Sequence, residues 1–158
     1  MRRLTGRAKL LLAMTIGALA LTPTALAAGP VVANGGGIGT VDGVTPFSHF
    51  GFGVTFGGGS VQGNFNCLMA GNAAFPGFEP LMKVSGAVTA GAANPALGTA
   101  SFDGAGTLNL GPSGRMPATF HVDVREGGPG VGILHLTVLS PLFPVPPERV
   151  LHGSISIH

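Results

Sequence analysis

The chain has 158 residues, including 28 Gly, 13 Pro and 10 Phe but no Trp or Tyr. Its formal charge of +2 comes from the N-terminal part, because residues 28–158 hold only four basic residues against six acidic ones and carry a net charge of −2. This balance excludes nucleic-acid binding through a basic patch, and the lack of Trp and Tyr weakens any proposal of an aromatic carbohydrate platform.

The first 27 residues predict a secretory signal peptide. Four basic residues within 2–9 precede an apolar stretch at 10–21, and Ala25-Leu26-Ala27 forms a small-x-small cleavage site. The apolar stretch is shorter than the roughly 20 residues that cross a bilayer, so a retained membrane anchor is the less favoured alternative. We expect cleavage after Ala27, a secreted, periplasmic or cell-envelope location, and no membrane span in the mature chain.

Residues 28–158 predict one Gly-rich all-β domain. Alternation of apolar and other residues indicates strands at 31–41, 47–56, 60–68, 81–90 and 98–110, with irregular segments at 71–80 and 91–97. Gly104 and Gly106 share the parity of the apolar residues in 98–110, which favours one long bent strand over a tight Asp103-Gly104 hairpin. Cys67 lies on an apolar strand face, which predicts a buried inert thiol, and a reactive or intermolecular thiol is the alternative.

The stretch 116–139 predicts a hairpin around a turn at 126–130. A five-residue turn places Val122 opposite Leu134 and His121 opposite His135. Both apolar faces agree in this register.

The C-terminal part contains a Pro-rich connection and one more strand. Four prolines in 140–147 favour an extended connection, and 148–158 predicts a strand with Leu151, Ile155 and Ile157 inward. No segment of the mature chain shows a helical period. We therefore predict a single antiparallel β-sandwich or closed barrel of about eight strands without a helix.

The C-terminal half carries a recognisable pattern of motifs. Its motifs are Leu-Met-Lys-Val at 81–84, a Gly-rich strand at 101–107, Thr-Phe-His-Val-Asp-Val at 119–124, a turn at 126–130 and Gly-Ser-Ile-Ser-Ile-His at 153–158. This pattern resembles a group of small exported bacterial β-proteins of unknown function, which end in a strand of the type GxIxIH. Residues 64–68 depart from the Tyr/Asp/His-type segment of that group, so no role is carried over to them. The resemblance implies an exported all-β domain and implies no activity.

The histidines form the one constellation with metal-ligand chemistry. In the predicted register His121, Asp123 and His135 share the outward face of the hairpin and would suit a Zn or Cu ion. The alternative is a polar outer face without a ligand. No other cofactor is indicated.

Enzyme signatures are absent, because the chain has no G-x-S-x-G, H-E-x-x-H or P-loop motif. Asp103 and Asp123 are the only carboxylates within predicted strands, and the sequence spacing does not pair them. We expect a non-enzymatic exported structural, envelope or binding module, with a metal-binding protein or enzyme on the His121/His135 face as the alternative. An open interior would offer an apolar ligand cavity instead of a packed core, lined by Phe50, Phe52, Phe56, Phe102 and Phe120. The partner is not indicated, and an unpaired edge strand would be a route to self-association.

Overall fold

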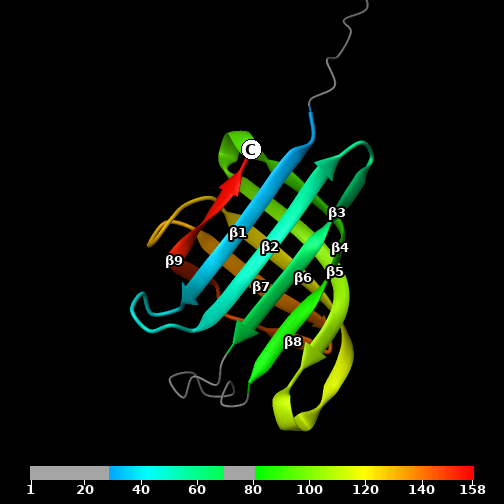
Figure 1. Cartoon of the computed structure of the whole chain (residues 1–158), viewed down its shortest axis with the longest axis vertical. Helices are drawn as coiled ribbons and strands as arrows, with labels where there is room; N and C mark the ends of the chain where they lie inside the picture. The colour runs from blue at the N-terminus through cyan, green and yellow to red at the C-terminus, as the bar shows by residue number, and fades with distance from the viewer. Residues whose placement is uncertain (1–28, 70–80) are drawn as a thin grey trace, which may run out of the picture.

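The computed structural model describes residues 29–69 and 81–158, which form nine strands and two short 3₁₀ turns (Figure 1). The predicted all-β class is confirmed. The predicted signal peptide and the irregular segment predicted at 71–80 lie outside the described residues. The strands are β1 (Val31–Thr40), β2 (Ser48–Gly57), β3 (Ser60–Met69), β4 (Met82–Asn94), β5 (Thr99–Asn109), β6 (Arg115–Arg125), β7 (Ile133–Ser140), β8 (Leu142–Pro144) and β9 (Glu148–Ile157), and the turns are η1 (Pro95–Leu97) and η2 (Gly111–Ser113).

The strands form one antiparallel sheet that closes on itself. Each strand from β1 to β7 pairs with the next one along the chain, and β9 pairs with both β1 and β7. Among the described strands, the short β8 pairs only with the end of β7. In Figure 1, β1, β2 and β3 therefore cross in front of β6 and β7, with the apolar faces of all these strands turned inward. Within the described residues, no helix is both long enough and apolar enough to cross a membrane.

The ring closes through a short ladder that a loop extends. β7 and β9 share only the pairs Ile133–Arg149 and Leu134–Glu148. Beyond them, the loop 126–132 continues the pairing, because Gly127 and Ile155 exchange backbone hydrogen bonds of 3.0 Å. The loop thus takes the place of a strand along part of β9.

Phenylalanine side chains fill the interior of the closed sheet. The ring centroids of Phe52 and Phe102 lie 5.5 Å apart, and those of Phe65 and Phe120 lie 5.2 Å apart. These spacings are typical of packed aromatic side chains, and Phe65, Phe102 and Phe120 are fully buried. Phe50, Phe52, Phe56 and Phe102, which alternation places on the inner face, are buried, and Cys67 is buried as predicted.

Glycines opposite the phenylalanines make this packing possible. Gly35 pairs directly with Phe52, and Gly104 pairs directly with Phe120. A Cβ atom at either glycine would overlap the ring of its partner. Each glycine therefore leaves the space that the partner's ring occupies, which explains why a chain so rich in glycine still has a dense core.

The segment after Val88 continues as a strand where the sequence predicted a loop. Residues 91–97 were expected to be irregular, yet β4 runs to Asn94 and pairs with β5 as far as Thr99. A register shift between Val88 and Ala90 interrupts the side-chain alternation. Beyond this shift, residues 90–94 still pair with β5 through their backbones, although their small side chains show no apolar alternation.

The first half of β9 faces the opposite way from the prediction. Ile38 pairs with His152 and Gly39 with Val150, so Leu151 is the extra residue of a bulge. Because a bulge reverses the alternation, Val150 points inward and the predicted inward position of Leu151 is wrong. Ile155 and Ile157, which follow the bulge, are buried as predicted.

The β6–β7 hairpin has a longer loop than the sequence predicted. Arg125 pairs with Ile133, so seven residues rather than five connect the strands. The predicted register is therefore wrong by two residues, and His121 lies opposite Thr137 instead of His135. A shift of two preserves the faces, so the apolar sides still agree. Of the two extra loop residues, Gly132 accepts a hydrogen bond from the Val150 N–H of β9, whereas the Val131 N–H donates to Gly128 within the loop.

Candidate functional site on the outer face of β5 and β6

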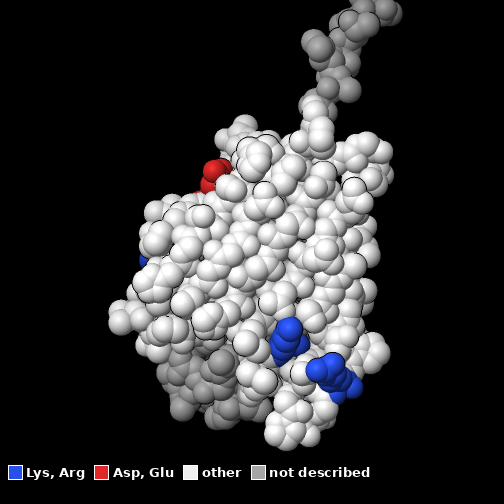
Figure 2. Space-filling model, in the orientation of Figure 1, with Lys and Arg blue, Asp and Glu red and all other residues white. Residues whose placement is uncertain are grey.

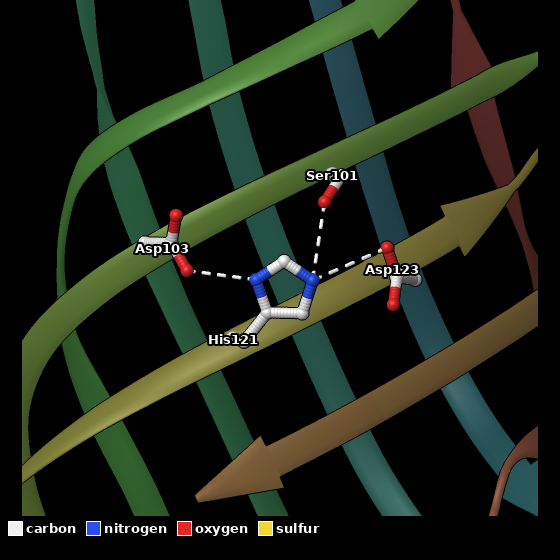
Figure 3. A network of polar contacts seen from close by, with 4 residues as sticks. All are labelled: Ser101, Asp103, His121 and Asp123. Carbon is white, nitrogen blue, oxygen red and sulfur yellow. Dashed lines mark hydrogen bonds and ion pairs between the residues drawn. The ribbon is translucent and has the colours of Figure 1, made fainter. Parts of the chain in front are cut away.

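Four polar side chains meet on the outer face of two neighbouring strands (Figure 3). His121 and Asp123 project outward from β6 because Phe120, Val122 and Val124 occupy its buried positions. The register then sets Asp103 of β5 opposite His121 and Ser101 opposite Asp123.

The imidazole of His121 contacts the other three side chains. Its Nδ1 lies 2.7 Å from Oδ1 of Asp103, and its Nε2 lies 3.2 Å from Oγ of Ser101. The same Nε2 lies 3.3 Å from Oδ1 of Asp123. About a third of the His121 side chain is exposed to solvent, as is about half of each carboxylate side chain. Both ring nitrogens therefore have an acceptor at a partly solvated surface.

The two carboxylates favour the protonated form of His121. Partial burial lowers the pKa of His121, but the hydrogen bond that His121 donates to Asp103 and the charge of Asp123 act in the opposite direction and raise it overall. A protonated imidazole donates from both nitrogens, which matches a carboxylate on either side. The arrangement therefore favours a positive charge on the imidazole between two carboxyl side chains.

A surface hollow of about 620 Å³ adjoins this network. Ser101 and Asp123 belong to both, so the polar network forms one border of the hollow. Arg125 forms another border, and its Nη2 donates a 3.1 Å hydrogen bond to the carbonyl of Val131. The remaining wall is mostly apolar, and the hollow is lined by Ala92, Ala93, Asn94, Thr99, Ala100, Ser101, Asp123, Val124, Arg125 and Ile133.

The predicted metal ligands are only partly brought together. His121 and Asp123 are in contact, whereas His135 lies on β7 opposite Asp123. Across residues 29–69 and 81–158, no group of three or more His, Cys, Asp or Glu side chains is arranged to hold a metal ion. The His121–His135 pairing is not formed, and the Zn or Cu site stays a prediction.

Sequence reasoning missed Ser101 and Asp103 as partners of His121. The signal lay in the turn between β5 and β6, where the Leu110 N–H donates to the Gly114 carbonyl and closes a tight connection through Gly-Pro-Ser. Pairing the two strands through this turn places Asp103 opposite His121. The separation of 18 residues gives no such hint without the register.

A second polar cluster lies inside the ring of strands. Glu148 is 1% exposed, its Oε2 accepts a hydrogen bond from Ser48, and its Oε1 is buried with no hydrogen-bond partner in the described part of the chain. Burial raises the pKa of Glu148 to about 7, against a smaller opposing effect of the Ser48 hydrogen bond. Burial, followed by the charge of Glu148, also raises the pKa of the Cys67 thiol. Glu148 begins the strand predicted at 148–158, and the predicted inward positions of Leu151, Ile155 and Ile157 would place it outward. Its burial is a consequence of the β9 bulge.

Comparisons of the chain with models of protein families, with curated proteins and with solved structures gave no match. The resemblance to small exported β-proteins therefore stays a prediction.

Proposed function

We propose that this protein is an exported, non-enzymatic binding module whose ligand occupies the hollow beside the His121 network. The observation that carries the proposal is the hollow of about 620 Å³, a size in the usual range for small-molecule sites. Export rests on the predicted signal peptide and on the resemblance to exported β-proteins.

The lining of the hollow indicates the kind of ligand. Alanine, valine and isoleucine side chains offer an apolar surface, and the polar lining residues are Asn94, Thr99, Ser101, Asp123 and Arg125. Asp123 and Ser101 can accept hydrogen bonds from amines or hydroxyls, and Arg125 can bind a carboxylate. A small ligand with an apolar body and one or two hydrogen-bonding groups fits this distribution.

Replacing Ala92 by phenylalanine should block this site. Ala92 is exposed and lines the hollow, so a ring there fills the space without entering the core. We expect fluorinated amphipathic fragments, screened by ¹⁹F NMR, to include binders that shift the amides of Ala93, Ser101 and Asp123. Ala92→Phe should weaken these binders at least about tenfold.

The matched control is Ala87→Phe, an exposed alanine of the same strand outside the hollow. This variant should bind the fragments as the wild type does. Fragment binding that leaves the hollow amides unshifted, or that both variants weaken equally, would contradict the proposed site.

A second candidate function follows from the order Asp103–His121–Ser101. A carboxylate on Nδ1 and a hydroxyl near Nε2 is the arrangement that activates serine nucleophiles in hydrolases. Two features favour binding over this chemistry. Asp123 also contacts Nε2 and favours its protonated form, which works against the role of His121 as a base. Ser101 lies within paired strands, where ladder bonds occupy the backbone N–H groups that an oxyanion would need.

The two functions differ in the reactivity of Ser101. A binding module should show no labelling by a fluorophosphonate probe above that of Ser101→Ala, measured by intact-protein mass spectrometry at pH 6 and pH 9. Labelling at Ser101 that disappears in His121→Asn would establish the hydrolase alternative.

A further inference from the structure

Two of the four basic residues in 28–158 stand together at the other end of β4, β5 and β6. Lys83 pairs with Asn109, and Asn109 pairs in turn with Arg115, so the three side chains form one row across three strands. Ser85 and Thr107, paired with each other, belong to the next row. In Figure 2, two basic side chains lie close together on this face, and no acidic side chain of the described residues is visible beside them.

These five side chains enclose a small polar hollow. Its volume is about 110 Å³, and its lining consists of Lys83, Ser85, Thr107, Asn109 and Arg115. At roughly 30 Å³ per water molecule, the space holds three or four waters, which is close to the size of one tetrahedral oxyanion. Every lining side chain can donate a hydrogen bond, and none is a carboxylate.

The hydrogen bonding of Asn109 leaves its donors available. The Oδ1 atom of Asn109 accepts a 3.0 Å hydrogen bond from the Gly111 N–H, which fixes the amide orientation. Its NH₂ group is then the end that can face a ligand. Within the described residues, neither Lys83 nor Arg115 forms an ion pair, so both charges remain uncompensated there.

We propose that this hollow binds a phosphate-type oxyanion. The planar guanidinium of Arg115 can donate two parallel hydrogen bonds to one anion, while the Lys83 ammonium supplies a second point charge from the opposite side. The two charges match a dianion, and the hydroxyls of Ser85 and Thr107 with the Asn109 amide satisfy further oxygens. This site is separate from the hollow beside His121 and does not depend on the function proposed for it.

The same chemistry would serve free phosphate or the phosphate of a lipid headgroup. Inorganic phosphate, titrated at constant ionic strength while the amides of Thr107 and Asn109 are followed by NMR, measures the first. Sedimentation with phosphatidylcholine vesicles containing one fifth phosphatidic acid measures the second. Binding in solution alone assigns a soluble anion, whereas stronger binding to the acidic vesicles assigns a headgroup.

Arg115→Gln and Lys83→Gln should each weaken phosphate binding at least about tenfold, because each removes a charge-assisted hydrogen bond. Arg115→Lys should restore part of the affinity. The matched control is Arg149→Gln, which removes an exposed charge outside the hollow and should leave the affinity nearly unchanged.

Two results would overturn the proposal. One is the absence of saturable amide shifts with both phosphate and vesicles. The other is a loss of affinity in Arg149→Gln as large as in Arg115→Gln, which would indicate attraction to overall charge rather than a site.

Discussion

Replacing Glu148 by glutamine should make the protein more stable at pH 8 by about 3 kcal/mol and change its stability little at pH 4. Glu148 is buried, and its Oε1 has no hydrogen-bond partner in the described part of the chain. Above neutral pH the wild type therefore holds an incompletely solvated charge inside the ring of strands, and glutamine removes that charge while keeping the shape.

The sign of this pH dependence follows from the different pKa values of Glu148 in the folded and the unfolded chain. The pKa of Glu148 is raised from 4.5 to about 7 on folding, so the unfolded chain loses this proton at a lower pH than the folded protein does. The stabilisation from the protonated carboxyl is complete below pH 4.5. It is lost as the pH rises from 4.5 to about 7, and the free energy of unfolding then stays level with respect to this group.

Urea unfolding at several pH values between 4 and 9 measures this effect. His121 complicates the upper part of the range, because its raised pKa also gives stability that is lost as the pH rises above 6.5. His121→Asn removes that contribution, which we expect to be about 1 kcal/mol or less at a partly exposed site. Glu126→Gln, at an exposed carboxylate, is the matched control and should follow the wild type. A parallel loss of stability in wild type and Glu148→Gln between pH 4.5 and 7 would contradict the assignment.

Substitutions at Gly35 and Phe52 should be strongly coupled. Phe52→Ala is expected to cost about 3–5 kcal/mol of unfolding free energy because it empties part of the aromatic core. Gly35→Ala is expected to cost about 1–3 kcal/mol, because its Cβ would overlap a Phe52 ring that already packs against Phe102. In the double variant the cost of Gly35→Ala should disappear, since the overlapping ring is gone.

Gly36→Ala is the control for backbone effects. Gly36 is the next residue on β1, and the nearest atom to a Cβ there is the Phe50 carbonyl oxygen at 3.8 Å. Alanine fits that space, so stability should stay equal or rise by a few tenths of a kcal/mol. Chemical denaturation of the wild type, Gly35→Ala, Phe52→Ala and the double variant gives the coupling energy between residues 35 and 52. Costs that simply add in the double variant would show that the ring does not limit residue 35.

The sequence alone determined which side chains face inward along most strands. Period-two alternation identified Phe50, Phe52 and Val54 on β2 and Phe120 and Val122 on β6, and these residues are buried. The same alternation identified 98–110 as one strand, since Gly104 keeps the parity of Phe102 and Leu108. Which side chains face the interior is well determined, because a shift of one residue would expose all the apolar side chains of the strand.

Only the tertiary structure decided which polar residues meet. The β6–β7 loop has two more residues than its turn motif suggested, and it hydrogen-bonds to β9 through Gly127, Gly130 and Gly132. The longer loop moves His121 away from His135. The bulge at Leu151 likewise turns Glu148 into the interior. Alternation is insensitive to a shift of two residues and fails across a bulge, so the register and the bulge had to come from long-range pairing. The outward face of this protein, and hence its candidate sites, is therefore a property of the closed ring of strands.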